Sequence, residues 1–204
     1  MSDTAASPAL PYAEPEQQRE AAFLGMYVFL GSEIMLFGGL FMVALAMRVL
    51  HPHEVVEASR QLHVWIGGIN TAVLLTSSLA VALAVHAARA HRRRLTMLLL
   101  LAAAALGLLF LGIKAVEYTL EYKDGLLPGL SDPERFSRPI ERLFMDLYFI
   151  ATGLHALHVT VGIVLLLMVA LRPSRPIVVE LSGLYWHLVD AIWIFLYPVL
   201  YLAR

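Results

Sequence analysis

Ionisable side chains lie inside long apolar stretches of this sequence, where a charged group is costly and is therefore a functional candidate. Glu33 lies within the apolar stretch 22–50, and His155 and His158 lie three residues apart within the stretch 142–171. Residues three apart share one side of a helix. Glu33 and His158 lie at comparable depths, so we expect a contact between Glu33 and one of the histidines. Such a contact is a polar lock between helices or a local proton reservoir.

The two histidines could also ligate a haem or a metal ion. A bis-histidine haem site in a membrane bundle needs histidines on two facing helices at one depth. The remaining histidines of apolar stretches, His63, His86 and His187, lie nearer the ends of those stretches. We therefore expect His155 and His158 to be core histidines with hydrogen-bond partners. We expect no metal ligands and no catalytic residues in this chain, since no nucleophile, phosphate loop or two-carboxylate site accompanies them.

Two further groups of ionisable residues lie at helical spacing. Lys114 and Glu117 are three residues apart, and Glu121 follows one turn later, so all three lie on one side of a helix. They fall in the outer third of their stretch, and we expect a boundary ion pair whose long side chains reach the membrane surface. His187 and Asp190 are also three apart, and they could relay protons or hold helices together.

The second apolar stretch carries several small polar side chains. Within a membrane, hydroxyl and amide groups bond across helices, and small residues let helices approach closely. We expect interhelical hydrogen bonding and close packing from Asn70, Thr71, Thr76, Ser77 and Ser78.

The composition indicates that these residues are positioned in a lipid environment. Of the 204 residues, 59% are hydrophobic and 15% are charged, which is more apolar than an ordinary soluble domain. The chain has no cysteine, which excludes disulfides, iron–sulfur clusters, cysteine-bound zinc and c-type haem. Its formal net charge of −1 gives no electrostatic case for a nucleic-acid partner.

The elements that position the polar residues are predicted to be membrane-spanning helices. A spanning helix needs about 20 mainly apolar residues, and the long apolar runs show no strand-like alternation. We predict an all-α, polytopic membrane protein with a polar arm at residues 1–21 and a single five-helix domain at 22–204. The five predicted helices cover residues 22–50, 62–88, 95–121, 142–171 and 181–202.

The arginines predict the orientation of the chain, since cytoplasmic loops carry an excess of Lys and Arg. The densest basic clusters lie in the second and fourth connections, on the same side as the N-terminus. We therefore expect a cytoplasmic N-terminus and an outside C-terminus. These clusters comprise Arg89, Arg92, Arg93, Arg94, Arg172 and Arg175.

The polar segments resemble subunit III of the haem–copper oxidases, in the short, five-helix form of that family. The resemblance rests on five motifs in family order: Ser-Glu-Ile-Met-Leu-Phe at 32–37, Asn-Thr-Ala-Val-Leu-Leu-Thr-Ser at 70–77, Phe-Leu…Glu-Tyr at 110–118, Gly-Leu-His-Ala-Leu-His-Val at 153–159, and Tyr-Trp-His-Leu-Val-Asp…Trp-Ile-Phe-Leu at 185–196. Together they cover nearly the whole chain beyond residue 22, and five motifs in order are highly specific.

The resemblance implies a subunit that supports a catalyst and carries no haem or copper itself. It implies direct binding to subunit I, with subunit II in the same complex, and bound phospholipid. The complex would pass electrons from cytochrome c to oxygen and translocate protons across the bacterial cytoplasmic membrane, with this chain helping to sustain proton uptake. Glu33 matches the family's membrane-embedded glutamate, and His155, His158, His187 and Asp190 match its other buried polar positions.

Other functions remain open on the sequence. A quinol oxidase subunit III and a subunit-III-like protein associated with nitric oxide reductase have similar motifs and length. A stand-alone haem b electron carrier would use His155 or His158. A small transporter is a further alternative, although the sequence shows neither interrupted helices nor an inverted repeat.

Overall fold

The computed structural model describes residues 14–123, 125, 139–172 and 175–202, and these residues form helices joined by short connections. Five of the helices are long and apolar enough to cross a membrane. The predicted all-α, five-span architecture is therefore confirmed. The helices are α1 (Pro15–Leu50), α2 (Pro52–Ser59), α3 (Val64–Arg89), α4 (Arg93–Lys123), α5 (Pro139–Leu171) and α6 (Pro176–Tyr201).

The helices begin earlier than predicted at α1, α5 and α6, the last two at Pro139 and Pro176 instead of residues 142 and 181, and one short helix was not predicted. The helix α1 begins at Pro15, so residues 15–21 of the predicted polar arm belong to a helix, while residues 1–13 lie outside the described residues. Proline at the first helical position is favourable because its missing N–H has no partner there in any case. A short amphipathic helix, α2, follows α1 directly and begins at Pro52. Its eight residues are too few to cross a membrane, so the apolar runs that predict the spans do not include it.

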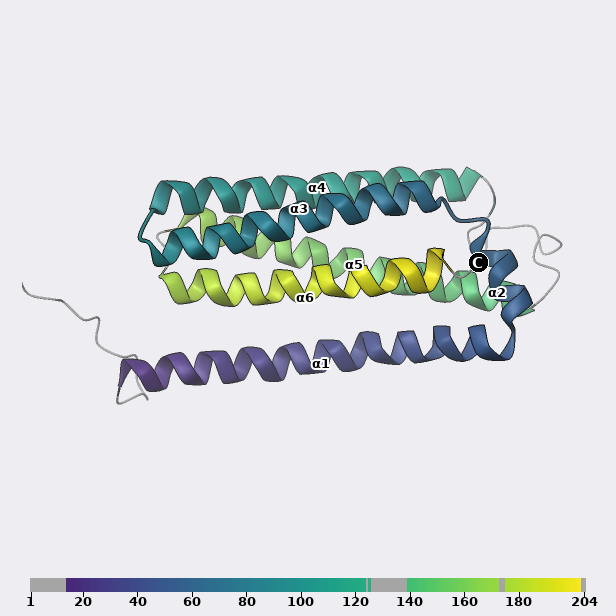
Figure 1. The fold of residues 1–204 in the computed structure, drawn as a ribbon, viewed down its shortest axis with the longest axis horizontal. Helices are drawn as coiled ribbons and strands as arrows, with labels where there is room; N and C mark the ends of the chain where they lie inside the picture. Colours follow the sequence, from purple (N-terminus) through teal and green to yellow (C-terminus); the bar gives the residue numbers. More distant parts are fainter. Residues whose placement is uncertain (1–13, 124, 126–138, 173–174, 203–204) are drawn as a thin grey trace, which may run out of the picture.

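The helices α3 to α6 run alternately up and down and pack into a four-helix bundle, and α1 lies along one side of it against α5 and α6 (Figure 1). In the most apolar segment of α1, 11% of the residues are buried, whereas 50% are buried in the corresponding segment of α6. The α1 helix is therefore the span most dependent on contacts outside this chain. Five crossings place the start of α1 and the end of α6 at opposite ends of the molecule.

In the core of the bundle, a large aromatic ring packs directly against glycines of the neighbouring helices. Trp186 of α6 is fully buried, and it lies against Gly107 of α4 and Gly162 of α5. A Cβ atom at either glycine would lie 2.8 Å from the indole ring. The absence of a side chain at these two positions allows α4, α5 and α6 to close around one tryptophan. Many large apolar side chains point outward instead, which is the arrangement expected in lipid.

Candidate functional site: polar clusters inside the helix bundle

The predicted Glu–His contact between the first and fourth membrane spans is present. Glu33 Oε2 of α1 lies 2.8 Å from His158 Nε2 of α5. The other ring nitrogen, Nδ1, lies 2.8 Å from the carbonyl oxygen of Leu154. A carbonyl oxygen only accepts, so Nδ1 must donate and carry a proton. The Glu33–His158 contact then holds one proton, either on the carboxyl group or on the imidazole, and the pair has no net charge in either form.

Aromatic groups shield this pair. The Phe37 ring meets the His158 ring edge-on at a centroid distance of 5.3 Å, and the Tyr185 hydroxyl donates to the His158 carbonyl oxygen over 3.0 Å. The Glu33 and His158 side chains remain 14% and 15% exposed. The pair therefore lies at the edge of the helix interface, and it connects the sparsely buried α1 to the bundle.

His155 does not contact Glu33, although the sequence left either histidine open as the partner. Its ring lies between Phe110 and Trp193, at centroid distances of 5.6 Å and 5.1 Å, and it is completely buried. Three residues along a helix leave the two side chains about 60° apart, which is enough to face different neighbours. Neither His155 ring nitrogen has a hydrogen-bond partner among the described residues, so the expectation of a satisfied core histidine is not met there.

The Lys114–Glu117 ion pair forms, but the expectation that its long side chains extend outward is wrong. Lys114 Nζ lies 3.0 Å from Glu117 Oε2, and the two side chains are 3% and 0% exposed. The lysine does not extend outward to water because hydroxyl groups of α5 and α6 meet it inside the bundle. The sequence gives the depth of a residue along its helix, but its burial depends on which neighbouring helices pack against that side.

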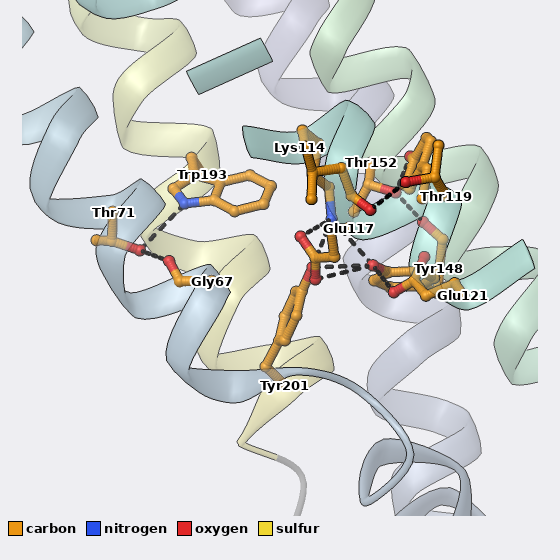
Figure 2. A network of polar contacts seen from close by, with 12 residues as sticks. Gly67, Thr71, Lys114, Glu117, Thr119, Glu121, Tyr148, Thr152, Trp193 and Tyr201 are labelled. Atoms are coloured by element: carbon orange, nitrogen blue, oxygen red, sulfur yellow. Dashed lines mark hydrogen bonds and ion pairs between the residues drawn. The ribbon is translucent and has the colours of Figure 1, made fainter. Parts of the chain in front are cut away.

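The buried lysine organises a cluster of carboxylates and phenols (Figure 2). Lys114 Nζ donates to the Tyr148 hydroxyl over 2.9 Å and to the Tyr201 hydroxyl over 2.5 Å. The Tyr148 hydroxyl in turn lies 2.6 Å from Glu121 Oε1, and the Tyr201 hydroxyl lies 2.7 Å from Glu117 Oε1. One ammonium and two carboxylates are thus joined by two phenols, and the contacts connect α4, α5 and α6.

Aromatic rings surround the same ammonium group. Lys114 Nζ lies 4.9 to 5.4 Å from the ring centroids of Tyr118, Tyr148, Trp193 and Tyr201. The faces of such rings attract a cation, and the attraction is stronger where water is excluded. None of these tyrosines was among the predicted site residues, since a tyrosine in an apolar stretch also suits the membrane interface. Tyr118 lies four residues after Lys114 on α4, a helical spacing that could have indicated it. Tyr148 and Tyr201 lie on α5 and α6, so no spacing along the chain relates them to Lys114.

Three of the polar residues of α3 bond across helices as predicted. Trp193 Nε1 donates to Thr71 Oγ1 over 3.1 Å, and Ser77 Oγ donates to the Ala103 carbonyl oxygen over 3.0 Å. Ser78 Oγ lies 2.7 Å from His187 Nδ1. These contacts attach α3 to α4 and α6.

The other two polar residues of α3 form no such contact. Thr76 is exposed and donates to the Ala72 carbonyl oxygen of its own helix, so the prediction of an interhelical bond is wrong there. Asn70 is completely buried, and its amide has no hydrogen-bond partner among the described residues. Consecutive polar residues on a helix point in different directions, so they cannot all meet one neighbour.

His187 and Asp190 do not form the suggested His–Asp pair among the described contacts. His187 instead contacts Ser78 of α3, and Asp190 is 3% exposed on the same side of α6. Neither carboxylate oxygen of Asp190 has a hydrogen-bond partner among the described residues. Both residues therefore belong to the α3–α6 interface, and a direct proton relay from one to the other is not supported.

Comparison with known proteins identifies the family of this chain. A model of the cytochrome c oxidase subunit III family matches residues 16–203, which is nearly the whole described chain. The chain belongs to this family. The resemblance inferred from the five motifs is therefore confirmed, and the family's subunit III is part of a multi-subunit haem–copper oxidase.

The relatives of this subunit III include proteins of two oxidase types. The chain is 34% identical to cytochrome c oxidase subunit 3 of Thermostichus vulcanus, over 88% of this chain and 86% of that protein. It is 31% identical to the subunit of the same name from Synechocystis, over 87% and 74%. It is 29% identical to quinol oxidase subunit 3 of Bacillus spizizenii, over 88% and 85%. Membership of a respiratory oxidase complex in a membrane is common to all three.

Proposed function

We propose that this subunit III is a non-catalytic part of a cytochrome c oxidase, which passes electrons from cytochrome c to oxygen and translocates protons. The observation that carries the non-catalytic role is the occupation of the histidines that could ligate a haem. His158 uses both ring nitrogens in contacts with Glu33 and Leu154, and the His155 ring is enclosed by Phe110 and Trp193. A haem would have to displace these contacts. Haems and copper then belong to the partner subunits.

The role of this chain is to stabilise subunit I, its lipids and its proton uptake. Direct binding to subunit I, with subunit II in the same complex, is supported by the poorly buried α1, whose apolar side chains are available to another protein or to lipid. Glu33 and His158 lie on that open side and hold one proton between them. They are placed to buffer protons near a partner, or simply to hold α1 in position.

We place this subunit III in a bacterial cytoplasmic membrane, with its N-terminus in the cytoplasm. This orientation is supported by Arg92, just before α4, and by Arg93 and Arg94 in its first turn, which lie together at one end of the bundle. The start of α1 lies at the same end of the bundle. Basic residues in short connections favour the cytoplasmic side.

A quinol oxidase is the second candidate, since several relatives carry that name at 28% to 29% identity. The higher identities to cytochrome c oxidase subunits, 34% and 31%, favour cytochrome c as the donor.

The deciding experiment is mild-detergent purification of the tagged chain from its native membrane, followed by mass spectrometry, visible difference spectra and oxygen uptake. We expect a large haem–copper subunit to co-purify and reduced cytochrome c to drive oxygen uptake. Uptake driven by quinol alone would assign the chain to the quinol branch. Recovery with a nitric oxide reductase would contradict the proposed function, and a haem spectrum from the isolated, folded chain would contradict the non-catalytic role.

A further inference from the structure

A row of four buried oxygen atoms lies at the end of the bundle where α4 and α6 end (Figure 2). Glu121 lies two residues before the end of α4, and Tyr201 is the last residue of α6. Both residues are completely buried, whereas Tyr122 and Lys123 beside them are exposed. The oxygen row is therefore enclosed by the bundle, yet it lies within about one helical turn of the end of α4.

The oxygen row contains three short contacts. Glu121 Oε1 lies 2.6 Å from the Tyr148 hydroxyl. The Tyr148 and Tyr201 hydroxyls lie 2.9 Å apart, and the latter lies 2.7 Å from Glu117 Oε1. Each phenol supplies one proton, and an ionised carboxylate supplies none. Two protons cannot fill three contacts, so one added proton on a carboxyl group is needed to make every contact a hydrogen bond.

Lys114 stabilises the oxygen row with or without the added proton. Its ammonium group has three N–H groups, and one of them donates to Glu117 Oε2 over 3.0 Å. The other two donate to the Tyr148 and Tyr201 hydroxyls over 2.9 Å and 2.5 Å. Because the same ammonium group binds both phenol oxygens, it holds them side by side even when no proton lies between them. Each phenol can still donate its own proton to either neighbour in the row.

Glu121 is the carboxyl group that the geometry favours for the added proton. Glu117 Oε2 contacts the ammonium group directly and its Oε1 accepts from Tyr201, so its negative charge is compensated. Glu121 Oε1 meets the ammonium group through the Tyr148 hydroxyl. A buried carboxylate is costly, and the uptake of a proton removes that cost.

The titratable groups in electrostatic contact with Glu121 come from three helices. They include Lys114, Glu117 and Tyr118 of α4, Tyr148 of α5 and Tyr201 of α6. The Tyr118 hydroxyl lies 2.6 Å from Thr152 Oγ1, so its proton is used outside the oxygen row. The two phenols that remain are those of the row itself.

We propose that the oxygen row is a proton-binding site, with Glu121 as the group that takes up and releases the proton. When a proton binds to Glu121 Oε1, this carboxyl group donates to the Tyr148 oxygen. The Tyr148 O–H then turns from Glu121 to Tyr201, while Tyr201 continues to donate to Glu117. Release reverses these steps, so one O–H group changes direction and no other proton moves. Linked ionisable groups within membrane spans are typical of proton-transfer sites.

This proton-binding site is separate from the Glu33–His158 pair. Tyr148 and His158 both lie on α5, and the ten residues between them correspond to about 15 Å along the helix. The proton is exchanged with water at the end of the bundle where α4 and α6 end, which the proposed orientation places outside the cell. The site depends on neither the electron donor nor the partner subunits, and it is a function additional to the support of subunit I.

Infrared difference spectroscopy tests the site in the full-length chain, purified in mild detergent with whichever subunits accompany it. The pH is stepped from about 9 to about 4, which spans ordinary and perturbed carboxyl groups. We expect the C=O stretching band of a protonated carboxyl group to appear as the pH falls and to be lost in Glu121→Gln. A phenol band, identified by ring-deuterated tyrosine, should change in the same titration and be lost in the same variant, because Tyr148 changes its hydrogen-bond partner.

The matched control is Glu33→Gln, which removes the carboxyl group of the other polar pair and should keep both bands. In Tyr201→Phe, Tyr148 has only the 3.4 Å contact with Glu117 Oε1 to turn to. The protonated form then loses one hydrogen bond more than the ionised form. The midpoint of the Glu121 band should therefore move to lower pH by about 0.5 to 1 unit.

Identical spectra of the wild type and Glu121→Gln would overturn the proposal, as would a carboxyl band without the phenol band. Loss of both bands in Glu33→Gln would assign them to the other pair and would also overturn it. If Glu121→Gln does not fold, Tyr201→Phe and Glu33→Gln decide: a shifted midpoint in the first and retained bands in the second support the site, and an unchanged midpoint in folded Tyr201→Phe overturns it.

Discussion

At the scale of single residues, Lys114 is the clearest case of a charge whose burial depends on its partners. It contacts Glu117, Tyr148 and Tyr201 inside the bundle, and the network extends to Glu121. Removing one member of a buried ion pair leaves an uncompensated charge, which costs more than the intact pair contributes. The cluster therefore holds α4, α5 and α6 together only as a complete unit.

Lys114→Met should lower the free energy of unfolding by about 3 to 5 kcal/mol, because it leaves two carboxylates without their ammonium partner. Thermal unfolding of the purified chain in detergent measures this. Lys123→Met, at the exposed end of the same helix, is the control and should change stability by less than about 0.5 kcal/mol. Equal melting temperatures for the two variants would contradict the importance of the cluster.

Glu33 gives a second prediction at this scale, because its contact with His158 can survive loss of the acid. In Glu33→Gln the amide can donate to His158 Nε2, so stability should change by less than about 1 kcal/mol. Glu33→Ala leaves the imidazole without its partner and should cost about 1 to 3 kcal/mol. Unfolding in detergent separates the two variants, with the exposed Glu16→Ala as the control.

Oxygen uptake by the intact complex distinguishes the two roles of Glu33. If the pair buffers protons, Glu33→Gln should lose activity progressively during sustained turnover despite normal stability. If it is a polar lock, Glu33→Gln should behave like the wild type and Glu33→Ala should fail. Unchanged stability, lipid content and sustained turnover in both variants would contradict both roles.

At the scale of helices, close approach depends on particular glycines and not on glycine content. Gly107 and Gly112 lie on α4, but only the first lies against Trp186 and Ile163. A Cβ at Gly107 would lie 2.8 Å from the indole ring, whereas one at Gly112 would meet nothing within 4 Å. The sequence does not separate the two positions, because the partner ring comes from a distant segment.

Gly107→Ala should destabilise the bundle by about 1 to 3 kcal/mol, as overpacking forces Trp186 or the helices to shift. Gly112→Ala should be neutral or stabilising by up to about 1 kcal/mol, since alanine is the better helix former. Thermal unfolding in one detergent compares the pair directly. A larger loss in Gly112→Ala than in Gly107→Ala would show that α4 packs differently.

At the scale of the whole molecule, the odd number of crossings places the two ends of the described chain on opposite sides of the membrane. Which side faces the cytoplasm depends on the arginines between α3 and α4. Because the chain has no cysteine, single introduced cysteines report the topology without background.

Arg94→Cys, in the first turn of α4, should react with a membrane-impermeant maleimide only in inverted vesicles. Arg60→Cys, just after α2, should react only in right-side-out vesicles. Both positions are exposed, so failure to label either one cannot be explained by burial in the fold. The reverse pattern would place the N-terminus outside the cell and contradict the proposed orientation.

The class of the molecule, its spans and its family follow from the amino-acid sequence. Apolar runs of 20 or more residues allow one solution in lipid, the hydrogen-bonded helix, so five spans follow from the length and spacing of those runs. Polar groups stand out against such a background, which is why Glu33, Lys114 and the two histidines were recognisable. The start of α1 and the helix α2 were not predicted, because their polar or amphipathic turns do not form a long apolar run.

Which polar groups contact one another depends on how the helices pack and does not follow from the sequence. Glu33 binds His158 and not His155, and Lys114 turns inward to phenols of α5 and α6. Contacts between helices depend on the rotation of each helix about its axis and on its neighbours, and neither is encoded in the depth of a residue along its own span.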